Sequence, residues 1–206
     1  MRRILLLAAA LSAFAVVGIA AAAKPPGVTI AAARPAVVFG SSVTLSGTVS
    51  NHQSGEHVFV LGRPYGGLTF TQVAAVDTTT NGKWSYMASP QIETSYEASW
   101  NAVSSRPITV KVRPRITLAL SSRTARRGTF TVQVSGNRSF AGKYVLVQRL
   151  TLSGPVTVKH VTLAAGSSAT FTIRLPRHHA RVRIVMPSSQ AAPGYIVGYS
   201  NVWKSS

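Results

Sequence analysis

Residues 43–49 read Val43-Thr-Leu-Ser-Gly-Thr-Val49, so apolar and polar side chains alternate along the chain. The same alternation recurs at residues 130–134, 171–173 and 181–184. A strand with this pattern buries one face and exposes the other to water. Gly, Pro, Asn and Ser separate these runs, and no window keeps a helical period for three turns. The chain is therefore predicted to be all-β.

The strands fall into two similar sets. Val28-Thr-Ile-Ala31 corresponds to Ile116-Thr-Leu-Ala119, and residues 55–60 correspond to residues 142–147. The offset between matched positions stays between 84 and 89 residues. A repeat of this length equals one β-sandwich of about seven strands. We therefore predict two tandem sandwiches with a short joint around Pro114, which should lie nearly end to end with limited hinge motion.

Residues 1–23 have the layout of a secretory signal peptide: paired arginines, an apolar run, and small residues ending at Ala23. The alternative is an uncleaved anchor, because the 20 residues from Ile4 to Ala23 could span a bilayer. Half of them are Ala or Gly, so the run is weakly hydrophobic. Cleavage before Lys24 is the favoured interpretation, and it would leave no transmembrane span. The predicted organisation is a signal peptide at 1–23, a first domain at 24–112 and a second domain at 113–206.

Five stretches carry a resemblance to a known group of proteins: Val38–Gly47, Gly82–Tyr86, Thr94–Ala98, Arg138–Arg149 and Gln190–Tyr195. They resemble tandem bacterial immunoglobulin-like domains of the kind found in exported actinobacterial proteins. The resemblance implies two immunoglobulin-like β-sandwiches. It also implies that Tyr96 forms a tyrosine corner, with its hydroxyl returning to the backbone at the start of a late strand. The second domain has Val182 near that place, so its corner must be built differently.

Burial must stabilise both sandwiches, because the chain has no cysteine and therefore no disulfide between its sheets. The expected core residues of the first domain are Val43, Leu45, Val58, Val60, Trp84, Tyr86, Tyr96 and Trp100. Those of the second domain are Val132, Val134, Val145, Val147, Phe171, Val182 and Ile184.

The two domains differ sharply in charge. Residues 24–112 carry six basic and four acidic side chains, whereas residues 113–206 carry fourteen basic and no acidic ones. The second domain cannot neutralise its own cations, so solvent ions or an anionic partner must do so. A generally basic proteome or a solubility device is the alternative explanation for this charge.

One predicted surface of the second domain combines arginines with tyrosines. If Val182, Ile184 and Met186 point inward, Arg181 and Arg183 point outward on the same strand. Guanidinium groups beside tyrosine rings suit an acidic polymer, by charge and by stacking on sugar rings or bases. The predicted binding residues are Arg174, Arg177, Arg181, Arg183, Tyr144, Tyr195 and Tyr199.

The sequence offers little for catalysis or metal binding. It has only four acidic residues, and no nucleophile elbow, zinc-binding helix motif or phosphate-binding glycine loop occurs. His178 and His179 are adjacent, and adjacent strand residues point to opposite faces, so the pair does not converge on a metal. We expect no catalytic residues, no metal site and no cofactor.

The favoured function is that of an exported, non-enzymatic binding or adhesion module. It would be secreted or retained non-covalently at the cell surface, and its basic second domain would bind an anionic cell-envelope polymer or an acidic polysaccharide. The alternative is a structural spacer or assembly domain whose edge strands pair with a protein partner. Extracellular nucleic-acid binding is permitted by the charge, but no base-reading motif supports it.

Overall fold

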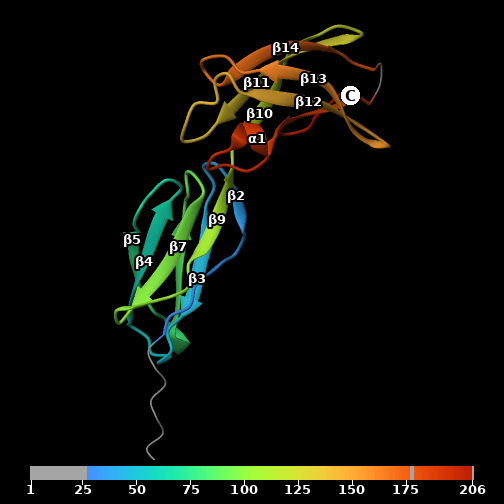
Figure 1. Cartoon of the computed structure of the whole chain (residues 1–206). Helices are drawn as coiled ribbons and strands as arrows, with labels where there is room; N and C mark the ends of the chain where they lie inside the picture. The colour runs from blue at the N-terminus through green and yellow to red at the C-terminus, as the bar shows by residue number, and fades with distance from the viewer. Residues whose placement is uncertain (1–26, 177–178, 206) are drawn as a thin grey trace, which may run out of the picture.

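The computed structural model describes residues 27–176 and 179–205, so the predicted signal peptide lies outside the described residues. Strands dominate the described chain, which forms two β-sandwiches that meet at their ends, with the strands of the second strongly inclined to those of the first (Figure 1). The first sandwich ends with β9 (Ile108–Arg113), and the second begins with β10 (Arg115–Arg123), so only Pro114 separates them. The described residues thus form an all-β fold, as predicted.

The first sandwich pairs a three-stranded sheet with a six-stranded sheet. The smaller sheet contains β1 (Ala31–Ala32), β3 (Val43–Thr48) and β6 (Lys83–Ala88), in that order. The larger sheet has the order β2 (Ala36–Val38), β9, β7 (Thr94–Trp100), β4 (His57–Pro64) and β5 (Thr71–Asp77), with β8 (Val103–Ser104) on β7. A 3₁₀ turn, η1 (Thr80–Gly82), leads into β6.

The second sandwich pairs a three-stranded sheet with a five-stranded sheet. The smaller sheet contains β10, β11 (Arg127–Ser135) and β14 (Ser168–Arg174). The larger has the order β13 (Gly154–Thr162), β12 (Tyr144–Thr151), β15 (Arg181–Met186) and β16 (Gly198–Tyr199), with β17 (Trp203–Lys204) also on β15. The short helix α1 (Ser188–Ala191) follows β15.

Both sandwiches use the same strand order. In an immunoglobulin constant domain, strands A, B, E and D face strands C, F and G. Here A, B and E correspond to β1, β3 and β6 in the first sandwich and to β10, β11 and β14 in the second. Strand C corresponds to β4 and β12. The strand that follows it, β5 or β13, pairs with it in the larger sheet, which faces the sheet of A, B and E. Both units are therefore immunoglobulin-like sandwiches, which confirms the predicted fold class.

The matched stretches of the two repeats occupy equivalent strands. The alternating stretches at 43–49 and 130–134 form β3 and β11, and residues 57–60 and 144–147 lie in β4 and β12. Every predicted core residue is buried except Tyr86, which is half-buried. Alternation thus placed the inward side chains of both sandwiches correctly.

Tyr96 is buried on β7, where a tyrosine corner was expected. Among the described residues, its hydroxyl makes no hydrogen bond to the backbone, so the expected tyrosine corner is not formed. Burial raises the pKa of Tyr96 to about 12, although the nearby Thr94 side chain opposes that rise. The phenol is therefore a neutral core group of the first sandwich at physiological pH.

Hydrogen bonds join the sandwiches on more than one side of Pro114. The Tyr195 hydroxyl donates to the Gln91 carbonyl at 2.6 Å, and the Glu93 amide donates to the Gly194 carbonyl at 3.0 Å. The Arg115 Nε donates to the Phe39 carbonyl at 3.0 Å. These contacts are spread across the junction, so they restrict bending about the single linking residue.

Two sequence patterns of the second domain meet at this junction. The Arg138 guanidinium lies 5.1 Å from the centroid of the Phe140 ring and donates hydrogen bonds to the carbonyls of Ala191 and Ala192. The Tyr195 hydroxyl also accepts a hydrogen bond from the Asn137 amide at 2.6 Å. The patterns Arg138–Arg149 and Gln190–Tyr195 therefore fix the loop that contacts the first sandwich.

Candidate polyanion-binding surface

The predicted alternation of β15 is present. Val182, Ile184 and Met186 are fully buried, whereas Arg181 is exposed and Arg183 is half-buried on the opposite face. Register places Arg183 opposite Gln148 of β12, and Val185 between Leu146 and Tyr199. These side chains share the outer surface of the larger sheet of the second sandwich.

Tyr199 lies between two arginines on this outer surface. The guanidinium carbon of Arg183 is 5.2 Å from the centroid of the Tyr199 ring, and that of Arg113 is 5.9 Å from it. Tyr199 is 48% exposed, so part of its side chain is accessible beside the two guanidinium groups. Arg183 also donates from Nε to Gln148 Oε1 at 3.0 Å, and Arg113 donates to the Val197 carbonyl at 2.6 Å. Both guanidinium groups are thus held in place by neutral partners.

Tyr144 extends the same surface toward the edge strand. Its ring stacks on the His160 imidazole of β13, with centroids 5.4 Å apart and an angle of 20° between the planes. Leu146 lies opposite His160 in the register of β12 and β13. The predicted positions of Tyr144 and Tyr199 on an outward face are therefore observed, together with Arg181 and Arg183.

The prediction that Tyr195 contributes to this surface is wrong. Tyr195 is only 4% exposed, and its ring packs edge-on against Phe140 at 5.5 Å. Burial raises the pKa of its hydroxyl, which both accepts and donates a hydrogen bond at the junction. The loop after β15 turns under the second sandwich toward the first, so the ring is unavailable to a ligand.

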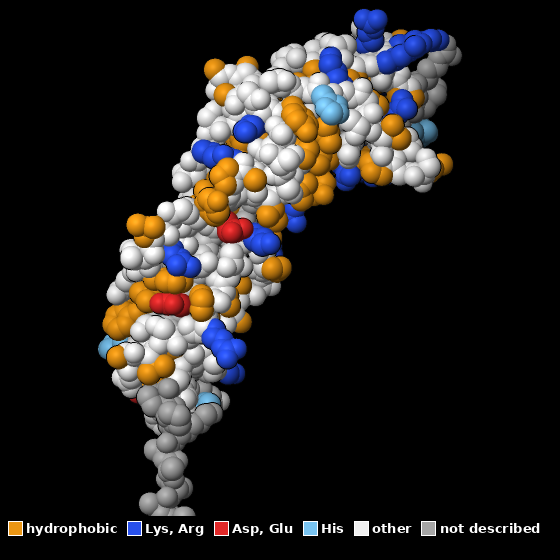
Figure 2. Space-filling model, in the orientation of Figure 1, with side chains coloured by type: hydrophobic (Ala, Val, Ile, Leu, Met, Phe, Trp, Pro, Cys, Tyr) orange, Lys and Arg blue, Asp and Glu red, His pale blue; other side chains and the backbone are white. Residues whose placement is uncertain are grey.

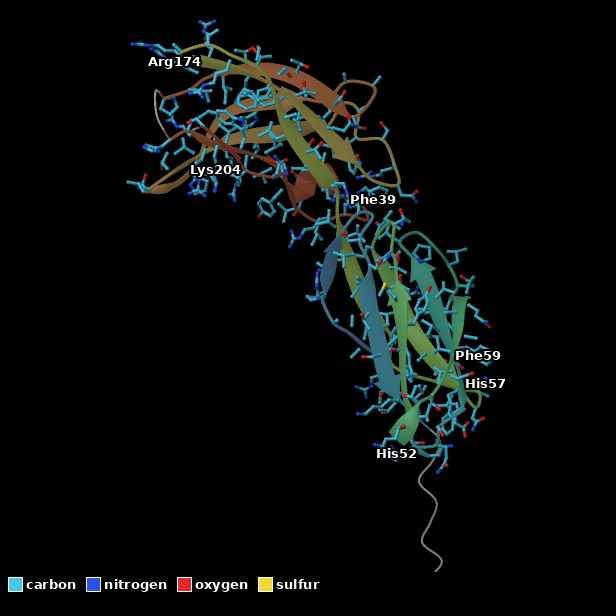
Figure 3. The ribbon with its side chains drawn as sticks, turned by 180° about the vertical axis from the view of Figure 1, so that it is seen from behind. Phe39, His52, His57, Phe59, Arg174 and Lys204 are labelled. Atoms are coloured by element: carbon cyan, nitrogen blue, oxygen red, sulfur yellow. The ribbon has the colours of Figure 1, made fainter. Side chains whose placement is uncertain are left out.

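Arg174 lies away from the surface formed by β12, β15 and β16. It ends β14 on the other sheet, where its register partner is Arg127 of β11. Figure 3 places Arg174 and Lys204 at the end of the second sandwich that is far from Phe39 at the junction. Arg177 lies outside the described residues. Arg181 is the register partner of Lys204, so it lies at the same end as Arg174 but on the other sheet, and the predicted residues are divided between two sheets.

A second cationic feature, not selected from the sequence, surrounds Arg174. Arg126, Arg127 and Arg174 line a cleft of about 540 Å³ together with Thr172 and Ile173. We call this feature the arginine cleft. Its sequence signal is the Arg126-Arg127 pair before Gly128, but only the pairing of β11 with β14 brings Arg174 beside it. Figure 2 shows Lys and Arg side chains gathered toward this free end, with carboxylates visible only on the first sandwich.

Two of the four acidic residues of the first sandwich, Glu56 and Asp77, make local side-chain contacts. Glu56 accepts hydrogen bonds from Trp100 Nε1 and Asn51 Nδ2, both at 2.8 Å, and these bonds lower its pKa. His57 Nδ1 lies 2.6 Å from Asp77 Oδ1 on the exposed surface. Within residues 27–176 and 179–205, no group of three His, Asp or Glu side chains could bind a metal ion, and no helix is long and apolar enough to cross a bilayer.

Comparisons with known proteins find structural likeness only. No protein-family model matches the sequence, and no curated protein matches it. A solved tetra-tandem repeat from the extending region of a large adhesion protein is 14% identical, with a TM-score of 0.37; the match covers 87% of this chain and 49% of that chain. A marsupial T cell receptor is 10% identical, with a TM-score of 0.40 over 86% of this chain and 71% of the receptor chain. The chain thus spans about half the length of the adhesion-protein fragment, and scores at this level do not assign a function.

Proposed function

We propose that this protein is exported and non-catalytic, with a near-neutral first sandwich as spacer and a basic second sandwich that binds an anionic polymer. The polymer belongs to the cell envelope or is an acidic polysaccharide near it. One observation carries the proposal: fourteen basic side chains and no acidic ones lie in residues 113–206. The signal-like segment at 1–23 supports an extracytoplasmic location.

Uncompensated cations on one sandwich produce a field that only mobile ions or a polyanion can neutralise. Polyanion binding releases the counterions condensed on the polymer, so affinity falls as salt rises. Retention at the surface would then be electrostatic. Hydrogen bonds between the two sandwiches restrict their relative motion, which suits the first sandwich to the role of a spacer.

The proposal is tested with the chain beginning at Lys24 and with isolated cell envelopes. We expect the protein to bind untreated envelopes at low salt and to be released by moderate salt. Envelopes whose anionic polymers have been removed chemically should retain little protein. Equal retention on stripped envelopes at all salt concentrations would contradict polyanion binding.

Edge-strand pairing with a protein is a second candidate function, favoured by β13. This strand ends the larger sheet of the second sandwich, and its Val156 and Val158 are 45% and 41% exposed. Exposed β-branched residues on an edge strand favour pairing with another chain. Envelope retention that persists at high salt and is lost on replacing Val156 and Val158 by Ser would favour this function over polymer binding.

A further inference from the structure

We propose that the arginine cleft binds a phosphate group, and that the polymer carrying it extends along the hydroxyl-bearing outer surface of β10, β11 and β14. This inference rests on the proposed function, because it names the site and the class of polymer. The ligand would be a chain of hydroxylated units joined by phosphodiesters. The tyrosine-containing surface of β12, β15 and β16 would then not be the principal site.

Like charges face each other in the cleft. Arg127 and Arg174 are directly opposite in the register of β11 and β14, which places their Cβ atoms about 4.5–5.5 Å apart. Arg126 is held beside them, because its carbonyl accepts a hydrogen bond from the Leu175 amide at 2.9 Å. Two opposed cations with a third beside them destabilise the sheet unless an anion lies between them.

The three guanidinium groups also have unused donors. Among the described residues, none of the three has a hydrogen bond, ion pair or ring contact through its side chain. On the tyrosine-containing surface, by contrast, Arg113 and Arg183 already contact Tyr199 and neutral acceptors, and of its arginines only Arg181 keeps unused donors among the described residues. A guanidinium matches phosphate oxygens with paired N–H donors, so the cleft suits a phosphate better than the other surface does.

A fourth cation reaches the border of the cleft from the other sheet. Lys159 of β13 donates from Nζ to the Thr172 carbonyl at 3.4 Å, and Thr172 lines the cleft. The ammonium group therefore crosses the gap between the two sheets near Arg174. Its charge adds to the field at the cleft and favours a polymer with successive negative charges.

Hydroxyl groups continue from the cleft along the outer surface of the sheet. Thr129 and Thr172 lie 3.0 Å apart through their hydroxyls, and Thr131 contacts Ser121 at 2.9 Å and Thr170 at 3.4 Å. Each hydroxyl has one donor and two acceptor sites, so these contacts leave capacity for a ligand. Strand geometry spaces the rows about 4.8 Å apart across strands and about 6.7 Å apart along them. A hydroxylated polymer can therefore bond at regular intervals.

The composition of this surface distinguishes between polyanions. Its outward side chains in β11 and β14 are Arg, Thr, Gln and Ser, and those from Thr117 to Ser121 in β10 are Thr, Ala and Ser. Binding of single-stranded nucleic acid relies on base stacking over aromatic rings, and these strands supply none on this face. Phosphate and hydroxyl recognition remain, which points to a polyol-phosphate or phosphorylated sugar chain.

The test compares two charge-matched double variants in the full chain beginning at Lys24. One replaces Arg126 and Arg127 by Ser, and the other replaces Arg181 and Arg183 by Ser. Poly(glycerol phosphate) is the probe, and affinity is measured from 50 to 200 mM salt. We expect the Arg126/Arg127 variant to bind about 10- to 100-fold more weakly, with a salt slope smaller by about 1 to 2. The Arg181/Arg183 variant should change affinity less than about threefold, because those side chains would lie outside the principal site.

Two further variants separate geometry from charge. Arg127→Lys keeps the charge and loses the planar fork, so affinity should fall about threefold to tenfold while the salt slope stays constant. Thr131→Val removes a hydroxyl with little change in shape, so affinity should fall about threefold with an unchanged slope. Thr157→Val, on β13 of the other sheet, is its matched control and should have no effect.

The outcomes separate this inference from the proposed function. If the unaltered chain binds no polyanion at low salt, the proposed function fails. If it binds but only the Arg181/Arg183 variant loses affinity, the site is assigned wrongly while the proposed function stands. Tighter binding of single-stranded DNA or polygalacturonate than of poly(glycerol phosphate) would overturn the ligand class. Thermal unfolding of each variant confirms that lost binding is not lost folding.

Discussion

Replacement of Gly194 by Ala should lower the free energy of unfolding by more than the cost of a left-handed backbone alone, because the added Cβ would clash with the first sandwich. Gly194 has a φ of +78°, and an added Cβ would lie 2.5 Å from Ile92 Cδ1 and 2.6 Å from Ile92 Cγ1 of the first sandwich. Real carbon atoms do not approach this closely, so Ile92 or the whole second sandwich must move. The Glu93 amide, which donates to the Gly194 carbonyl, would move with it.

Gly142 provides a matched control for this substitution. Its φ is +75°, and an added Cβ would meet nothing within 4 Å. Both Ala variants adopt a left-handed conformation at a cost of about 1–2 kcal/mol. Only Gly194→Ala adds the overpacking cost of about 1–3 kcal/mol. We therefore expect Gly142→Ala to lower the free energy of unfolding by about 1–2 kcal/mol, and Gly194→Ala by about 2–5 kcal/mol.

Urea unfolding of the chain from Lys24 measures both free energies, and small-angle X-ray scattering measures the distance between the sandwiches. Ile92→Ala removes both contacting atoms, so the double variant Gly194→Ala/Ile92→Ala should recover at least about 1 kcal/mol relative to additivity. If Gly194→Ala lowers the free energy of unfolding no more than Gly142→Ala does, and leaves the scattering curve unchanged, the close contact between Gly194 and Ile92 at the junction would be contradicted.

Three further perturbations have defined outcomes. The unfolded chain loses the Tyr96 proton near pH 10 and the folded chain at about 12, so the stability that the buried neutral phenol contributes is complete below pH 10 and lost as pH rises through 12. Tyr96→Phe should therefore remove about 2–3 kcal/mol of the difference in unfolding free energy between pH 9 and pH 12. An unchanged difference would contradict the raised pKa of Tyr96. Gly47→Ala places a Cβ 1.8 Å from the carbonyl oxygen of Thr29, in the segment that precedes β1, so it should lower the free energy of unfolding in urea by at least about 3 kcal/mol and displace that segment. A cost under about 1 kcal/mol would show that the segment before β1 shifts without resistance. N-terminal sequencing of exported protein should begin at or near Lys24, and an intact Met1 would indicate an anchor instead.

Alternation was sufficient to predict which side chains of each strand point inward, because side-chain parity in a strand is fixed by backbone geometry. Val182 and Ile184 were placed inward from the sequence alone, and both are fully buried. The outward direction of Arg181 followed from the same rule. A two-residue period thus identifies faces within one strand, whatever the topology.

Contacts between distant segments could not be predicted in the same way. Tyr195 follows Pro-Gly in a loop, and nothing local shows that this loop folds beneath the sandwich to meet Gln91. Arg174 precedes Arg181 closely in sequence, yet the chain changes sheets between them, and strand pairing brings Arg174 to Arg127 instead. The alternation of residues shows which face of a strand a side chain lies on. Which strands lie beside each other depends on long-range pairing, which a single sequence does not show.

Polyanion binding by the second sandwich can be tested through the salt dependence of poly(glycerol phosphate) binding by the chain from Lys24. Titration calorimetry at several salt concentrations yields the slope of log affinity against log salt. We predict measurable binding at 50 mM salt and a negative slope of at least about 2, since three arginines line the cleft. An absence of binding at low salt, or an affinity that does not change with salt, would contradict the claim that the second sandwich binds an anionic polymer through its uncompensated charge.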